Sequence, residues 1–215
     1  MTAGAPDRSL VVTLAAVAAL GPVATNLYLP ALPAVREHFG ASVAEVQATF
    51  SVSLVMFAFG ILAWGPISDR YGRRIAVIGG LAIMVIGAIV SLASLSLGWQ
   101  IAGRALQAFG AATGIVTARA IISDLYPVDQ MAKVLASITM VAVLGNSLAP
   151  VAGGLITAGF GWRAIFAALV LAAAVVAVAV WTRLPETRPP GAHPPRAREM
   201  ATTAWSLLRM PMFRY

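Results

Sequence analysis

The apolar segment "GRALQAFGAATG" carries a charged and an amide side chain three residues apart, Arg104 and Gln107. Residues at this spacing share one face of a helix, and Gly110 continues that face. A charge at the centre of a membrane helix costs about 2.5–3.5 kcal/mol, so we expect Arg104 to face a polar cavity rather than lipid. The alternative is that its side chain extends back to the membrane surface near Trp99.

A second group of charged residues lies in "WGPISDRYGRR", between two long apolar runs. Because proline and glycine interrupt helices, we expect Gly65 and Pro66 to end one helix and Gly72 to allow the reversal into the next. The arginines suit an anionic membrane surface, each contributing about 1 kcal/mol. Asp69 adds nothing to that attraction, and its simplest role is a local ion pair, worth about 0–1 kcal/mol if exposed. The charged and glycine residues of this motif are Gly65, Asp69, Arg70, Gly72, Arg73 and Arg74.

A third motif, "GNSLAPVAGG", repeats small residues at a spacing of four: Gly145, Ala149 and Gly153. Small residues at this spacing let another helix approach closely. Pro150 is expected to bend the helix that carries them. From the residues alone, packing is the expected role of these glycines.

Apolar runs supply the helices that must position these motifs. Hydrophobic residues make up 60% of the 215 residues and charged residues 11%, against about 45–50% and about 25% in soluble domains. Roughly 20 helical residues cross the hydrocarbon core of a bilayer. We therefore predict an all-α membrane protein with six transmembrane helices. The runs are 10–29, 43–64, 75–97, 100–122, 131–157 and 163–182, and the first is expected to be a retained helix rather than a cleaved signal peptide.

The positions of lysine and arginine predict the topology. If the chain starts in the cytoplasm, most of these cations fall on the cytoplasmic side and only Arg36 and Arg163 on the other. Cations concentrate in cytoplasmic loops, so both termini are expected to be cytoplasmic, in the plasma (inner) membrane. Four tryptophans are expected at the membrane surfaces. These are Trp64 and Trp181 at the inner surface, and Trp99 and Trp162 at the outer surface.

Three regions follow from this topology: a cytoplasmic N-terminus (1–9), a six-helix transmembrane unit (10–183) and a cytoplasmic linker (184–215) rich in proline and charge. Near the inner end of the fourth run, Arg119 and Asp124 are five residues apart and so lie on different faces. We expect them to pair separately, with the Asp69 loop and with Lys133.

The composition excludes several kinds of chemistry. The chain has no cysteine, and its two histidines lie in predicted loops without a second ligand, so no metal site or cofactor is expected. The spans contain no histidine and no converging acids, so we do not expect an enzyme. The net charge of +7 is accounted for by inner loops, so no nucleic acid partner is expected.

Together the motifs resemble a known family. The pattern G-x-x-x-D-R-x-G-R-R in "GPISDRYGRR" closely resembles the cytoplasmic loop motif of the major facilitator superfamily. Arg104, Gln107 and Gly110 resemble its R-x-x-Q-G motif, with the glycine at a looser spacing. The segments "NLYLPALP", "RAIISDLYP" and "GWRAIF" resemble its bicyclomycin-resistance, or Bcr/CflA, type. The segment "GNSLAPVAGG" resembles the motif associated with antiporters in that superfamily, through Gly145, Pro150, Gly153 and Gly154. Ala149 stands where a glycine is usual.

The resemblance implies the amino-terminal six-helix half of a multidrug efflux transporter that exchanges small amphipathic substrates for protons between two halves. It places Asp69 in a gate that contacts the other half, and Arg104, Gln107 and Gly110 on the coupling or substrate path. The implied partners are the lipid bilayer, a small amphipathic substrate, and a missing C-terminal half or a second copy. Without a partner half, the chain is not expected to transport.

One residue departs from the type that the chain resembles. An aspartate usually stands where this chain has Asn26, and an asparagine forms hydrogen bonds but does not titrate. Glu45 is the nearest substitute, although a solvated glutamate at a helix end is its simpler interpretation. Two alternatives remain: a homodimer of half-transporters, and a membrane scaffold or regulator that transports nothing.

Overall fold

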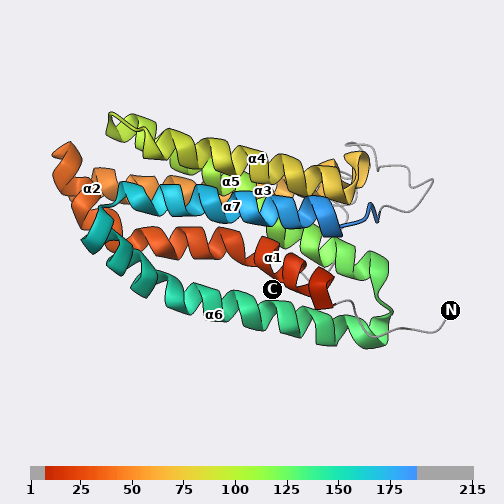
Figure 1. Ribbon diagram of the computed structural model, residues 1–215. Helices are drawn as coiled ribbons and strands as arrows, with labels where there is room; N and C mark the ends of the chain where they lie inside the picture. Colours follow the sequence, from red (N-terminus) through yellow and green to blue (C-terminus); the bar gives the residue numbers. More distant parts are fainter. Residues whose placement is uncertain (1–7, 188–215) are drawn as a thin grey trace, which may run out of the picture.

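A computed structural model describes residues 8–187, which form a bundle of helices joined by short connections (Figure 1). The described residues contain no β-strand. The elements are α1 (Arg8–Tyr28), the 3₁₀-helix η1 (Leu29–Ala31), α2 (Leu32–Phe39), α3 (Val43–Tyr71), α4 (Arg73–Leu92), α5 (Leu97–Leu125), α6 (Val128–Phe160) and α7 (Arg163–Arg183).

This architecture confirms the predicted all-α membrane fold. Six helical segments in the described part of the chain are long and apolar enough to cross a membrane, the first formed by α1, η1 and α2 together. The chain is therefore a multi-pass membrane protein. The expected N-terminal region and linker lie largely outside the described residues, which exclude 1–7 and 188–215.

The bundle has two ends (Figure 1). The Arg73 end holds the α3–α4 and α5–α6 connections and the end of α7. The Arg163 end holds the α4–α5 and α6–α7 connections, together with α2.

Two expected helix boundaries are wrong. The helix α3 continues through Gly65 and Pro66 to Tyr71. An apolar environment offers the backbone no partner other than the helix itself, so helical structure persists around a single proline. At the other end, the first span does not stop in a loop, because η1 and α2 extend it to Phe39. Their prolines stand in the first turns, where a missing N–H costs nothing.

The expected turn at Gly72 is confirmed. Gly72 ends α3 with a φ of 103°, a conformation that favours glycine, and the chain turns there directly into α4. The helix α6 remains continuous through Pro150, and its ribbon is curved (Figure 1).

The four tryptophans differ in their burial within the bundle. Trp99 and Trp181 are exposed near helix ends, but Trp64 and Trp162 are buried. The indole Nε1–H of Trp64 donates to the backbone oxygen of Phe109 at 2.8 Å. Trp64 therefore fixes α3 on α5, because a buried indole needs a hydrogen-bond acceptor.

The helix α5 lies at the centre of the bundle. In an 18-residue apolar stretch of each spanning helix, 61% of the residues are buried for α5, but only 22% for α3 and 17% for α6. Close contact with α4 depends on facing glycines. A Cβ on Gly110 would lie 2.4 Å from the backbone nitrogen of Met84 and 2.5 Å from the oxygen of Gly80. The two backbones approach closely because Gly110 has no side chain.

Gly110→Ala is therefore expected to destabilise the bundle by about 1–3 kcal/mol, the usual cost of overpacking. The matched control is Gly159→Ala in α6, where an added Cβ meets nothing within 4 Å. Thermal unfolding of the detergent-solubilised chain measures both. Equal midpoints for the two variants would contradict the close α4–α5 contact.

Candidate functional site

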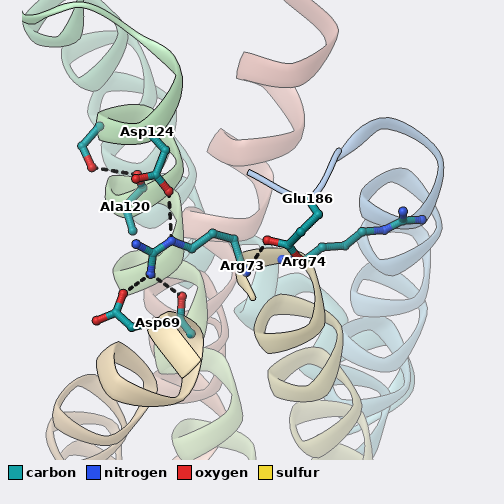
Figure 2. Close-up of polar contacts among 8 residues, drawn as sticks. Asp69, Arg73, Arg74, Ala120, Asp124 and Glu186 are labelled. Atoms are coloured by element: carbon teal, nitrogen blue, oxygen red, sulfur yellow. Dashed lines mark hydrogen bonds and ion pairs between the residues drawn. The ribbon is translucent and has the colours of Figure 1, made fainter. Parts of the chain in front are cut away.

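Arg73 is the centre of a charge network at the Arg73 end (Figure 2). Its guanidinium pairs with Asp69 of α3, and its Nε lies 3.0 Å from Oδ2 of Asp124 on α5. The side chains of Arg73 and Asp124 are 13% and 14% exposed, whereas that of Asp69 is 42% exposed. Water screens exposed pairs most strongly, so the pair with Asp124 contributes more to stability. The network joins three helices and leaves Asp69 partly free to contact another surface.

The carboxylate of Glu186 closes the same cluster from the segment after α7 (Figure 2). The backbone N–H of Arg73 donates to its Oε1 at 2.9 Å, and that of Arg74 to its Oε2 at 3.3 Å. A carboxylate at a helix N-terminus is favoured by the unpaired N–H groups and the helix dipole. A Cβ on Gly72 would lie 2.5 Å from Oε2 of Glu186. Gly72 therefore permits both the turn and this contact.

Glu186 was missed by the sequence analysis. It lies more than a hundred residues from Arg73, and no spacing rule links a linker acid to a distant helix start. Arg74 provides a second contact to α7, because its guanidinium donates to the backbone oxygen of Trp181 and lies 4.8 Å from the indole centroid. The loop motif is thus attached to α7 by Glu186 and Arg74.

The expected pairings of Arg119 and Asp124 are wrong, because Asp124 pairs with Arg73 rather than with Lys133. Asp124 joins the Asp69 loop through Arg73. Within residues 8–187, Arg119 makes no ion pair, so the expected pairing of Arg119 is wrong. It is exposed and lines a hollow of about 210 Å³ between α1, α5 and α6, where Thr139 and Asn146 are the other polar lining residues.

Arg104 faces the interior of the bundle, which confirms the inward orientation and excludes an extension to the surface. It is 1% exposed, its Nη1 donates to Oε1 of Gln107 at 2.8 Å, and its guanidinium lies 4.5 Å from the ring centroid of Tyr28. Its Nε and Nη2 have no hydrogen-bond partner in the described part of the chain. Tyr28 offsets part of the charge by a cation–π contact.

Asn26 connects α1 to α6. Its Nδ2 donates to Oδ1 of Asn146 at 2.6 Å and to the backbone oxygen of Pro22 at 3.1 Å. Glu45, the alternative acid, is exposed and forms a capping box with Ser42 at the start of α3. The contacts of Glu45 are those of a helix cap, in agreement with its simpler interpretation.

The α6 motif also packs against α1. A Cβ on Gly153 would lie 2.0 Å from the backbone oxygen of Leu27, and one on Gly145 would lie 3.2 Å from the side chain of Val23. Gly154 is less constrained, since its nearest contact is Pro30 at 3.9 Å. The motif therefore lets the α1 and α6 backbones approach closely, as its spacing predicted.

Comparison with known proteins identifies the family. The model of the Major Facilitator Superfamily matches residues 14–214. The chain belongs to the Major Facilitator Superfamily. Members of this superfamily are transporters, so membership confirms the expectation of a transporter rather than an enzyme.

Two relatives of this superfamily member confirm the resemblance to the bicyclomycin-resistance type. The bicyclomycin resistance protein homolog of Haemophilus influenzae is 34% identical over 161 residues, which cover 75% of this chain and 40% of the relative. Multidrug resistance protein D of Escherichia coli is 32% identical, over 76% of this chain and 41% of the relative. The chain spans about two fifths of the length of these curated relatives.

A solved structure supports the superfamily fold. The crystal structure of the human organic anion transporter MFSD10 superposes with a TM-score of 0.68 at 23% identity. The match covers 88% of this chain and 50% of that transporter.

A double-mutant cycle tests the network of Arg73 and Asp124. Pairs in direct contact usually show coupling of about 0.5–3 kcal/mol, so Arg73→Ala and Asp124→Ala should be non-additive in the free energy of unfolding. The control cycle combines Arg73→Ala with Arg119→Ala, which share no contact and should be additive. Additivity in both cycles would contradict the network.

Proposed function

We propose that this six-helix unit is one half of an efflux transporter that exports small amphipathic molecules and works with a second six-helix unit. The observation that carries the proposal is the superfamily match over residues 14–214, with relatives named for drug resistance of which this chain spans about two fifths. Transporters of this kind hold substrate near the midplane between two repeats.

The burial of the helices supports pairing with a second unit. The apolar stretches of α3 and α6 are 22% and 17% buried, against 61% for α1 and α5. The exposed surfaces of α3 and α6 include Phe59, Leu62, Leu148 and Leu155. These two helices therefore have the surface that a second unit would cover.

We further propose that the Arg73 end and both termini lie on the cytoplasmic side of the plasma (inner) membrane. Arg70, Arg73, Arg74 and Arg183 gather at this end, in accordance with the excess of cations in cytoplasmic loops. Asp69, partly exposed beside Arg73, would then contact the second unit and close the inner side.

Proton exchange is the proposed energy source, with the titrating carboxylate supplied by the second unit. In the described residues, the acids of the membrane helices all lie within two residues of a helix end. They are Glu37, Glu45, Asp69, Asp124 and Asp129. Asn26 cannot titrate, and Arg104 remains a buried cation that favours a nearby carboxylate in its charged form.

Reconstituted vesicles test this function. A pH gradient, acid inside, should drive accumulation of amphipathic dyes in vesicles that contain associated units, and a proton ionophore should abolish it. The dyes should include neutral, cationic and anionic members. Equal uptake of the dyes with and without the gradient would contradict the proposal, provided that the preparation has the mass of two units.

The mass of the transporting species distinguishes the two partners. Flux from the chain alone at twice its mass favours a second copy, for which a symmetric dimer is the commonest arrangement. A strict monomer without flux would exclude the homodimer as the working form. A second half of different sequence would then be the partner.

Asn26→Asp is expected to give flux an additional dependence on pH, because it places a titratable group beside Asn146. Flux is measured in the reconstituted vesicles at a series of pH values with a constant gradient. The matched control is Asn26→Gln, which keeps an amide and should add no pH dependence. Identical profiles for the two variants would contradict a position on the proton path.

A further inference from the structure

We propose that the hollow between α1, α5 and α6 binds the carboxylate group of an amphipathic organic anion, with Arg119 as its counter-ion. The proposal assigns a substrate class to the transport proposed above, and rests on that proposed function for the movement of the ligand. Binding itself depends only on the described residues.

The wall of the hollow has the composition of a site for an amphipathic molecule. Apolar side chains form most of it, contributed by all three helices, among them Ala18, Ile122 and Ile138. Its polar groups are the guanidinium of Arg119, the hydroxyl of Thr139 and the amide of Asn146. Small-molecule sites commonly combine an apolar wall with a few polar groups that fix the orientation of the ligand.

Arg119 is a cation without an ionic partner in this wall. No aspartate or glutamate lines the hollow. Within residues 8–187, no carboxylate lies at ion-pair distance from Arg119. Arg119 lies six residues before the end of α5, which corresponds to about 9 Å along the helix. A guanidinium at this depth is stabilised by an anion, and its planar fork fits a carboxylate with two hydrogen bonds.

The charges of the other helices favour the same class of ligand. Two charged residues of the described helices lie at least six residues from either end of their helix, and both are arginines, Arg104 and Arg119. Arg104 is buried with two donor nitrogens unpartnered, so it adds positive potential without neutralisation by an acid. Such an interior attracts anions and repels cations.

The volume limits the part of the ligand that this unit holds. About 210 Å³ is less than the 300–1,000 Å³ that is typical of sites for drug-sized ligands. The hollow therefore fits a small carboxylate, or the carboxylate end of a larger molecule whose remainder extends toward the second unit. Benzoate is a suitable probe, since it combines one carboxylate with one apolar ring.

A calorimetric titration of the full purified chain tests the site. Benzoate is compared with benzamide, which has the same shape without the charge, and with benzylamine, which is a cation at neutral pH. We expect benzoate to bind at least about tenfold more tightly than either, because charge-assisted hydrogen bonds are roughly twice as strong as neutral ones. Equal binding of benzoate and benzamide would overturn the proposal.

Arg119→Gln should remove the preference for benzoate, whereas Arg119→Lys should retain part of it. Lys133→Gln is the matched control, because Lys133 is an exposed cation of α6 that does not line the hollow. It should leave the preference unchanged. If Arg119→Gln retained the full preference, or Lys133→Gln removed it, Arg119 would not be the counter-ion.

A lipid phosphate is the other source of an anion at this depth, and a second titration distinguishes it. The chain is placed in nanodiscs of phosphatidylcholine alone or of phosphatidylcholine with phosphatidylglycerol. Retention of benzoate binding in both supports a soluble carboxylate ligand. Abolition of binding by phosphatidylglycerol would assign the hollow to a lipid headgroup and overturn the proposal.

The two proposals fail separately. If the gradient drives no flux but benzoate still binds, the transport function is overturned and the anion site remains. The reverse result is gradient-driven flux of dyes together with equal binding of benzoate and benzamide. This result would leave the transport function and overturn the anion site.

Discussion

Close backbone contact around α5 is the constraint on which the rest of this bundle depends. Helices in a bilayer gain little from burying apolar side chains against one another, because lipid tails are equally apolar. Packing must come instead from short distances between backbones. Three glycines provide these distances: Gly60 of α3 lies against α5, Gly110 of α5 against α4, and Gly114 of α5 against α1. With these contacts formed, α5 carries Arg104 on its buried side and Arg119 at the hollow.

The charges at the helix ends follow from this arrangement. Because α3, α4 and α5 are held together by glycine contacts, Asp69, Arg73 and Asp124 meet where the three helices end. The ion pairs therefore fix the relative positions of helix ends that glycine packing has already brought together. Acids stay at the ends while arginines occur further inside, so the bundle has a positive interior between mixed-charge surfaces.

Sequence reasoning predicted the features that depend on composition and local spacing. The six spans, the turn at Gly72 and the inward orientation of Arg104 follow from apolar length, glycine and the cost of a charge in lipid. It failed where a distant contact overrides a local preference. Pro66 stays within a helix because lipid offers its neighbours no other hydrogen-bond partner. The indole of Trp64 donates to the backbone oxygen of Phe109 on α5, a partner that local spacing does not indicate. The contact of Glu186 with α4 joins residues that no periodicity relates.

That last contact has a mechanical consequence. Glu186 attaches the first residues after α7 to the start of α4, so any chain that continues from this point is tethered beside the Arg73 network. A movement that displaces the N-terminus of α4 must then either carry the tether along or break its attachment to Glu186. The contact thus couples the position of the α3–α4 connection to that of the residues directly after α7.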